Sequence, residues 1–309
     1  MVSLLRLARF FPNLGWLFNF LRFPGLRTGL RVEVSNAGIF RYGKAVSIGE
    51  GSRIEVASQG SIEISDAVSI SRGVHLASTE GLHIRIGART TLQDGCRIYG
   101  EVAIGQRCIF APNNFVSSGT HTFDALPHLP IQVQEAQAGW ESKRVRIFSD
   151  CWFGINAVIL RGVTVGRGCV VGANSVVTKD LPPYSVAAGN PAQIVRQRLD
   201  FLPKERIEAC NEADDPYFYD GFDLASGKRA ASKATTGEEF TLALRKHDAR
   251  KLRLNVSGEG TTIAYGEDCR PLERNPSVIE FEIDPPSRNS EFLQMKATGP
   301  CLIVWAELA

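Results

Sequence analysis

One stretch of the sequence gathers residues that could act on a substrate as bases or hydrogen-bonding groups. Residues 112–145 hold His121, Asp124, His128 and Trp140, and two of the five histidines of the chain lie here. A neutral imidazole accepts a proton near pH 7, because the ordinary pKa of histidine is about 6.5. The stretch therefore predicts a general base, while position alone leaves a structural role for either histidine open.

The residues around this stretch follow a period of six. From about Ile48 to Val177 an aliphatic residue returns at every sixth position, often followed by glycine. The clearest run is Phe153, Ile159, Val165, Val171 and Val177, and earlier runs in their own phases are Ile86, Leu92, Ile98 and Ile104, Ile48 with Ile54, and Ile64 with Ile70. Such a period fits neither an α-helix nor a hairpin sheet, and it predicts a short strand and a turn repeated around a parallel β-helix.

A second column of small or β-branched residues follows four positions after the anchors. Its members are Thr90, Cys96, Val102, Cys108, Cys151, Ala157, Val163, Cys169 and Ser175. We expect both columns to point inward, because a larger side chain at a corner would overpack the core at a cost of roughly 1 to 3 kcal/mol. The four cysteines of the column are therefore interpreted as buried thiols rather than as nucleophiles or metal ligands.

The period breaks between about Pro112 and Val145. Ile104 and Ile147 are 43 positions apart, which is not a multiple of six, so a loop is inserted there. Long loops in compact domains are usually functional, because the rigid coil supports them without needing them for its core. His121 is expected where this loop leaves the coil. Asp124 could orient the imidazole ring or bind a substrate hydroxyl, or it could be a solvated loop carboxylate.

The segment Cys151–Leu160, continuing through Val171–Asp180 to Gly189–Ala192, resembles the hexapeptide-repeat acyltransferases. The resemblance covers about Ile48–Arg198 and is strongest to the branch of galactoside, maltose and capsular sugar O-acetyltransferases. It implies a left-handed parallel β-helix, an exception to the usual right-handed crossover. It also implies acetyl-CoA as the acetyl donor, and a homotrimer with the active site between neighbouring coils.

The resemblance implies roles for individual residues. His121, in Gly-Thr-His-Thr, matches the histidine that takes a proton from the acceptor, and Ile155 and Ala173 match positions that bind the pantetheine arm through backbone groups. Positions near the nucleotide end of the cofactor are matched by Thr178, Lys179 and Arg196, whereas Gln193 stands where relatives often carry a basic residue. The candidate contacts to the acceptor are Asn114, Asp124 and Trp140.

With the resemblance, these residues predict an acetyl-CoA-dependent O-acetyltransferase that acts on a sugar hydroxyl. Three other functions are weighed against it. A sugar hydroxyl is a weak nucleophile, so a base near the acceptor oxygen is the missing ingredient, and inward cysteines favour direct transfer over an acyl-enzyme. An N-acetyltransferase of an amino sugar and a non-catalytic scaffold remain alternatives. A zinc enzyme of the carbonic-anhydrase kind needs three converging histidines, but His75, His83 and His121 lack a common phase, so no metal is expected.

Composition bounds the setting of the protein. Among 309 residues, 35 Lys and Arg face 33 Asp and Glu, so bulk charge gives no reason to expect a nucleic-acid partner. The seven cysteines form no CxxC pair, which fits a reducing, cytoplasmic location. Residues 1–32 carry five arginines, no acidic residue and many apolar ones, so they could pack on the body of the protein or contact the inner face of a membrane peripherally.

The sequence thus predicts a mainly β protein with four parts. They are a basic apolar segment (1–32), a left-handed β-helix with an extruded loop (33–199), a helix and linker (200–237) and a small antiparallel β-sandwich (238–309). The helix is expected over Leu202–Ala213. The sandwich is expected from alternating runs, and it could pack on the coil, build the oligomer or hold a glycan. Those runs are Phe240–Leu244, Leu252–Val256, Ile279–Ile283 and Cys301–Trp305.

Overall fold

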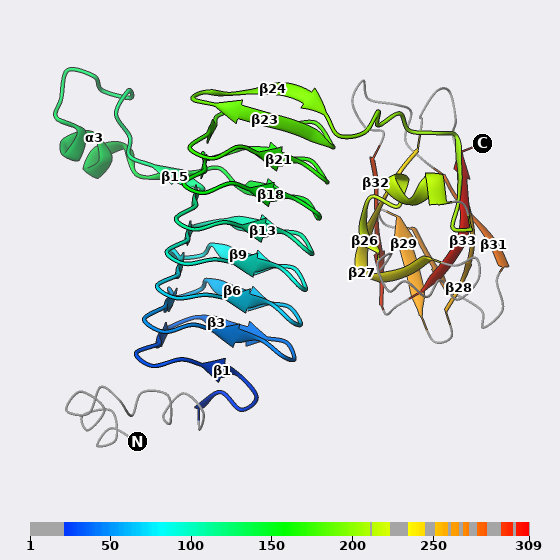
Figure 1. The fold of residues 1–309 in the computed structure, drawn as a ribbon, viewed down its shortest axis with the longest axis horizontal. Coiled ribbons are helices and arrows are strands. Elements are labelled where there is room, and N and C mark those ends of the chain that lie inside the picture. Colours follow the sequence, from blue (N-terminus) through cyan, green and yellow to red (C-terminus); the bar gives the residue numbers. More distant parts are fainter. Residues whose placement is uncertain are drawn as a thin grey trace. The chain divides into compact units, whose positions relative to one another are not determined.

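The computed structural model describes residues 22–210, 212–222, 234–244, 251–258, 261–265, 268–271, 277–282, 292–298 and 301–308. The chain divides into two compact units, Met1–Leu199 and Asp200–Ala309. The first unit is a left-handed parallel β-helix with an extruded loop, and the second consists of antiparallel sheets (Figure 1). The predicted fold class is confirmed.

Three parallel sheets, here called faces A, B and C, form the β-helix. Face A comprises β1 (Arg27–Thr28), β4 (Ser47–Ile48), β7 (Ser69–Ile70), β10 (Thr91–Leu92), β13 (Ile109–Phe110), β18 (Trp152–Phe153), β21 (Val170–Val171), β23 (Ser185–Gly189) and the antiparallel β24 (Ala192–Gln197). Face B comprises β2 (Glu33–Asn36), β5 (Arg53–Val56), β8 (His75–Ser78), β11 (Arg97–Tyr99), β14 (Phe115–Ser117), β19 (Val158–Ile159) and β22 (Val176–Val177). Face C comprises β3 (Ile39–Tyr42), β6 (Ser61–Ile64), β9 (His83–Ile86), β12 (Val102–Ile104), β17 (Val145–Ile147) and β20 (Thr164–Val165).

The separate phases of the early repeats come from coils of two lengths. Ser69 lies beside Ser47 and Thr91 beside Ser69, so these coils take 22 residues, whereas Ile109 lies beside Thr91 after only 18. The four additional residues lie between faces B and C, where the early strands are four residues long and the later ones two or three. The corner between faces B and C thus absorbs length while the other two keep the period of six.

The extruded loop leaves the coil at this same corner, between β14 of face B and β17 of face C (Figure 1). Ile147 lies directly beside Ile104, so the 43-residue step is one coil of 18 residues plus 25 residues of loop. The loop contains β15 (Gly119–Thr120), α3 (Ile131–Ala138) and β16 (Glu141–Ser142), and β15 pairs with β16 at its neck. The predicted insertion is confirmed.

Inward aliphatic residues from every coil form one continuous core, in which Phe110 and Phe153 stack at 4.5 Å. The small inward column does more than avoid overpacking, because its side chains donate hydrogen bonds to turn carbonyls of the following coil. The donors and acceptors are Ser52 Oγ to Ser71 O (2.9 Å), Thr90 Oγ1 to Gly105 O (2.8 Å), Cys96 Sγ to Ala111 O (3.2 Å), Cys108 Sγ to Phe148 O (3.3 Å), Cys151 Sγ to Gly166 O (3.2 Å) and Cys169 Sγ to Pro182 O (3.0 Å). Small donors therefore recur because buried carbonyls require partners.

Burial controls the chemistry of these thiols. It raises the pKa of Cys96 and of Cys169 to about 11, and the pKa of Cys151 rises well above its ordinary value for the same reason. A thiol with so high a pKa remains protonated at neutral pH, and the thiolate is the nucleophilic form. The interpretation of these cysteines as unreactive thiols agrees with this environment.

Replacement of Cys96 by serine should make the protein less sensitive to alkaline pH. The thiol ionises near pH 9.0 when exposed and near pH 11 when buried, so the folded state binds more protons and its stability falls across that interval. The expected loss is roughly 2 to 3 kcal/mol for this thiol. Serine keeps a donor for Ala111 O but does not titrate there. Urea unfolding at pH 8 and 10.5 measures the difference, and identical pH dependence in both proteins would contradict it.

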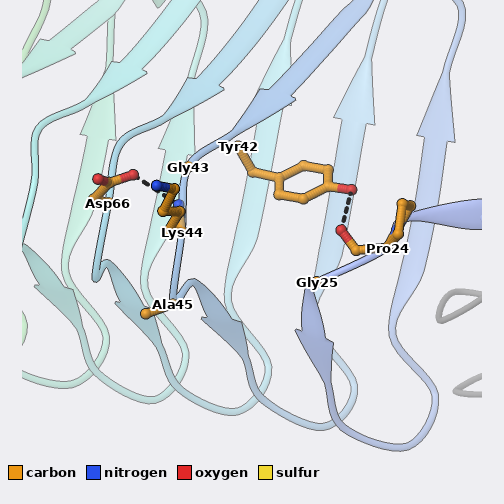
Figure 2. Close-up of a pocket in the computed structure, with 7 residues that line it drawn as sticks. All are labelled: Pro24, Gly25, Tyr42, Gly43, Lys44, Ala45 and Asp66. Atoms are coloured by element: carbon orange, nitrogen blue, oxygen red, sulfur yellow. Dashed lines mark hydrogen bonds between the residues drawn. The ribbon is translucent and has the colours of Figure 1, made fainter.

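Aromatic side chains close the first coil. Phe23 contacts Phe40 and Tyr42 edge to face, at 5.5 and 6.2 Å between ring centroids, and Leu26 is buried beside them. Figure 2 shows the pocket of about 560 Å³ at this end, where the Tyr42 hydroxyl donates to Pro24 O. Residues 22–32 thus pack on the coil, whereas residues 1–21 lie outside the described part of the chain.

The second unit is built from antiparallel strands, and β27 pairs with strands of both of its sheets. They are β25 (Arg206–Glu208), β26 (Asp220–Phe222), β27 (Ala234–Ala243), β28 (Lys251–Ser257), β29 (Thr262–Tyr265), β30 (Asp268–Pro271), β31 (Ser277–Glu282), β32 (Phe292–Ala297) and β33 (Leu302–Leu308). One sheet pairs β27 with β32 and another pairs it with β33. Buried residues such as Leu254, Phe281 and Ile303 make its core. The predicted antiparallel strands are confirmed. Of the predicted helix and linker (200–237), residues 223–233 lie outside the described residues, and 234–237 belong to the strand β27.

The helix predicted over Leu202–Ala213 is wrong. Arg206–Glu208 is the strand β25, paired with β33, and only a 3-10 helix, η2 (Glu212–Tyr217), follows. The reason is tertiary: Ile207 is fully buried, while Arg206 forms an ion pair with Glu307 at 2.6 Å and stacks on the Trp305 ring. Pairing to a neighbouring strand overrides local helix propensity.

Candidate functional site

His121 stands at the neck of the extruded loop, directly after β15. Its side chain is 76% exposed, and its Nδ1 lies 2.5 Å from Oε2 of Glu135 on α3. The ring is therefore held at its Nδ1 side by a carboxylate. Because the described partner occupies Nδ1, the opposite nitrogen, Nε2, faces away from that carboxylate.

The loop folds locally so that α3 presents Glu135 to the ring. Gln134, the preceding residue, is buried, donates to Leu129 O at 2.8 Å and accepts from the Leu126 amide at 3.0 Å. The Thr122 hydroxyl donates to Gly139 O at 2.8 Å and so ties the end of α3 to the residue after His121. These bonds fix both ends of the His121–Glu135 contact.

The neck of the loop is fastened to the coil by side chains of both strands. The Ser118 and Ser142 hydroxyls are 2.7 Å apart, and Glu141 contacts Arg161 of the next coil at 2.5 Å. Hydrogen bonds from Arg161 and Lys143 hold the pKa of Glu141 below its ordinary value. Trp140 lies against Gly119 so closely that an added Cβ would stand 2.0 Å from the indole. The neck therefore fixes the backbone from which His121 extends, while α3 holds its ring.

This arrangement suits proton abstraction. With the Glu135 carboxylate accepting at Nδ1, the proton of the neutral ring is on Nδ1 and Nε2 carries the free lone pair. Such a ring can take a proton from a hydroxyl within hydrogen-bond reach. Glu135 occupies the orienting place for which Asp124 was considered, since Asp124 is exposed and no contact of it with the ring is observed among the described residues. Sequence reasoning missed Glu135, which no fixed spacing connects to His121.

Replacement of Glu135 by glutamine should lower kcat roughly tenfold, a part of the 10² to 10⁴ that a positioned base contributes. The amide keeps the size of the side chain but removes the charge that selects the Nδ1-protonated form. Steady-state kinetics measure the change in kcat. Gln137→Ala, at an exposed position of the same helix, serves as the matched control. Equal losses in both variants would contradict the orienting role of Glu135.

Ile155 and Ala173 lie together at the corner between faces A and B. They occupy the same place in adjacent coils, and the Asn174 amide donates to Ile155 O at 2.9 Å. Asn156 and Asn174 adopt left-handed φ angles of 58° and 56°, and Asn156 Nδ2 donates to Asn174 Oδ1 at 3.0 Å. Ile155 and Ala173 are both exposed. This corner presents a straight edge of turn backbone to solvent.

The other predicted cofactor residues stand elsewhere on the prism. Thr178 and Lys179 are exposed at the corner between faces B and C, after β22, and Arg196 is exposed on the edge strand β24 of face A. About six residues separate two corners, which is roughly 20 Å at 3.3 Å per residue. One chain therefore brings Ile155 to Ala173 and Thr178 to Lys179, but it does not bring these pairs and Arg196 to one point.

Two further predicted residues have distinct surroundings. Trp140 is half-exposed at the loop neck beside Gly119. Asn114 is fully buried in the small inward column, where its Nδ2 donates to Ala111 O at 2.6 Å. Asn114 thus lies in the coil core and not on a surface that an acceptor could reach. The prediction that Asn114 contacts the acceptor is therefore wrong. It was made because Asn114 lies close to the loop in sequence, although its side chain points into the coil.

The histidines considered for zinc are distributed over separate elements. His75 is on β8 of face B, His83 is on β9 of face C and His121 is on the loop. Across the described ranges, no group of three His, Cys, Asp or Glu side chains lies close enough to hold a metal ion. In the same part of the chain, no helix has the length and hydropathy needed to cross a bilayer.

Residues 144–179 match the family model described as bacterial transferase hexapeptide (six repeats). A Staphylococcus aureus (strain COL) protein named "Putative acetyltransferase" is 44% identical over 79 residues, which are 25% of this chain and 40% of that protein. A chloramphenicol acetyltransferase of Agrobacterium fabrum is 38% identical over 88 residues, which are 28% of this chain and 41% of that protein. The chain thus spans about two fifths of the length of these relatives.

Solved structures also resemble the chain. The crystal structure of a polysialic-acid-specific acetyltransferase matches with a TM-score of 0.41 and 24% sequence identity, over 59% of this chain and 84% of that one.

Proposed function

Residues 144–179 carry the repeat of the bacterial hexapeptide transferases, and from this premise we propose that the protein is an acetyl-CoA-dependent O-acetyltransferase. Its acceptor is a sugar hydroxyl of a cell-surface polysaccharide or of its precursor. The observation that carries the proposal is the imidazole of His121, exposed at the rim of the coil and held by Glu135 at 2.5 Å.

In the proposed reaction, Nε2 of His121 takes the proton of the acceptor hydroxyl as its oxygen attacks the thioester carbonyl. The C–S bond then breaks, and the leaving sulfur of coenzyme A takes the proton from Nε2 of His121, which returns the imidazole to its neutral form. Base catalysis of this kind contributes roughly 10² to 10⁴ in rate. The inward thiols of the coil are buried, and burial raises the pKa of Cys96, Cys151 and Cys169, which supports direct transfer without an acyl-enzyme.

Acetyl-CoA is proposed to lie along the corner that holds Ile155 and Ala173, with its pantetheine arm against the exposed turn backbone. Lys179 and Arg196 carry positive charge suited to its phosphates. Within one chain, Lys179 and Arg196 lie away from the corner of Ile155 and Ala173 and away from each other. This separation supports a cofactor site that a second copy of the chain completes. The cofactor then contacts residues of more than one protomer.

An apolar row on face A supports the proposed homotrimer. The outward residues of face A, coil after coil, are Arg27, Ser47, Ser69, Thr91, Ile109, Trp152, Val170 and Val186. The row changes from polar to apolar at Ile109, which is 47% exposed, and Trp152 is 51% exposed. Contiguous exposed apolar surface on a soluble domain is typical of an interface. The row borders the corner of Ile155 and Ala173, so a copy docked there can bring its own loop to that corner.

Transfer of label from acetyl-CoA to a glycan panel tests the proposed function. The panel contains paired sugars that differ only in a hydroxyl or an amino group, and mass spectrometry locates the added acetyl group. Acetylation of hydroxyls is expected, with intersecting lines in double-reciprocal initial-rate plots. Preferred acetylation of amines would replace O-transfer by N-transfer, and a chain that does not bind coenzyme A would contradict enzymatic function altogether.

A cytoplasmic location, with residues 1–32 resting peripherally on the inner face of the membrane, completes the proposal. The five arginines and the absence of acidic residues in this segment suit an anionic surface. Flotation with anionic liposomes compares the whole chain with one that starts at Arg22, which keeps the packed residues Phe23 and Leu26. Equal flotation of the two chains would contradict membrane contact through residues 1–21, and no flotation of either chain would contradict membrane contact through the whole segment.

A further inference from the structure

A chain of polar side chains crosses the outward surface of face B on the side of the extruded loop. The Tyr99 hydroxyl lies 2.9 Å from Nδ1 of His75, and Nε2 of His75 lies 3.3 Å from a carboxylate oxygen of Glu55. The three residues come from β11, β8 and β5, which are successive strands of the face. Each bond runs diagonally from one coil to the next, so the phenol is fixed in place by two partners in series.

The Tyr99 ring is also fixed by packing. It meets His75 edge to face at 5.1 Å and Phe115 edge to face at 5.7 Å between ring centroids. Ala77, the register partner of Tyr99 on β8, is small and leaves room for the two rings above it. Phe115 and Tyr99 together make an ordered aromatic surface that remains partly exposed. Preordered rings contribute contact area at low entropic cost.

An arginine stands beside these rings without an acidic partner. Arg97 lies in register between His75 and Phe115, is exposed, and forms no ion pair with another described residue. Arg53, the next arginine along the same row, is 3.4 Å from Glu33, and Arg41 and Arg85 on face C share Glu63. The guanidinium of Arg97 is therefore available to an external anion.

This surface leads directly to the proposed base. β14 carries Phe115 and ends at Ser117, and His121 follows four residues later. The Cα atoms of Ser117 and His121 are therefore at most roughly 14 Å apart. Successive strands of a face are about 4.8 Å apart. Contacts on β14 and β11 thus continue in a row away from His121, as an extended acceptor would require.

We propose that the outward surface of face B on β11 and β14, the strands just before the loop, is an acceptor subsite for an acidic saccharide. This proposal rests on the proposed function. The rings of Tyr99 and Phe115 contact the C–H faces of sugar units, and Arg97 binds a carboxylate of the acceptor through two parallel N–H donors. Glu55 and His75 position Tyr99 and do not touch the sugar. The substrate class is accordingly an oligosaccharide that carries uronic-acid type carboxylates.

Binding without acetyl donor tests this subsite separately from catalysis. Calorimetric titration of the full chain uses tetragalacturonate, a hyaluronan tetrasaccharide and the neutral galactose tetramer. At least one acidic probe should bind more than tenfold tighter than the neutral one. Arg97→Gln should abolish that preference, and Tyr99→Ala should weaken all binding. Tyr99→Phe, which keeps the ring but not its bond to His75, should have an intermediate effect.

Arg85→Gln, an exposed arginine on face C, is the matched control and should leave binding unchanged. Circular dichroism and thermal unfolding establish that each variant is folded. Equal binding of acidic and neutral probes, or an unchanged preference in Arg97→Gln, would overturn the subsite. If the Arg97-dependent preference is found but no glycan is acetylated, the proposed function fails and the subsite stands.

Discussion

Replacement of His121 by alanine lowers kcat by at least about 100-fold, the lower end of what a positioned base contributes. The side chain is exposed on a loop and takes no part in the core, so the coil is expected to fold as before. KM for acetyl-CoA should change little, because the imidazole is proposed to touch the acceptor hydroxyl and not the donor. Steady-state kinetics with the identified acceptor measure the effect, and thermal unfolding establishes that the fold is kept.

His128→Ala provides the matched control for this substitution. His128 lies on the same loop and is also exposed, and no hydrogen bond of it to another described residue is observed. It should retain full activity. A His121→Ala protein with near-normal turnover would remove His121 from the mechanism, and an equal loss in His128→Ala would point to the loop as a whole rather than to one imidazole.

Replacement of Trp152 by aspartate should separate the proposed trimer into monomers and reduce turnover more than about tenfold, because the misplacement of one protomer's groups by even 1 Å costs up to 100-fold. Trp152 points outward from face A in the middle of the apolar row, next to Val170. A carboxylate buried at such an interface would lose its hydration without gaining a partner. Light scattering coupled to size exclusion measures the mass, and kinetics follow on the same fractions.

Ile39→Asp is the control for exposure. Ile39 is 50% exposed, nearly the same as the 51% of Trp152, but it lies on β3 of face C, outside the apolar row. This variant should assemble and turn over as the parent does. A Trp152→Asp protein of unchanged mass and activity would show that face A is not the interface, and a parent protein that is itself monomeric would remove the trimer from the proposal.

The coil could be predicted because its core repeats in the sequence. An aliphatic anchor such as Ile159 or Val171 meets similar surroundings in every coil, so the spacing of six residues indicates the repeated strand and turn. The 22-residue coils could not be read from that period, since the additional residues between Val56 and Ser61 sit at a corner that contributes no anchor. In the sequence, these additional residues appear only as a shift in the run of aliphatic anchors.

The site was predictable to a smaller extent. His121 was found because the repeat stops there, but Glu135 contacts it through the fold of a loop that has no repeat of its own. Asn114 was misplaced because the period was taken to end before it, although its side chain fills an inward position. The strand at Arg206–Glu208 depends on Glu307, about a hundred residues away, and no local pattern reports such a partner.

The vertex between faces B and C decides what can be added to this protein without unfolding it. The coil accepts four residues there in its early turns and 25 in a later one, while Ile147 still lies beside Ile104. An insertion at that vertex therefore leaves the register of the stacked coils unchanged. A different insertion at this vertex would therefore leave the proposed donor corner and the proposed acceptor surface of face B in their present places.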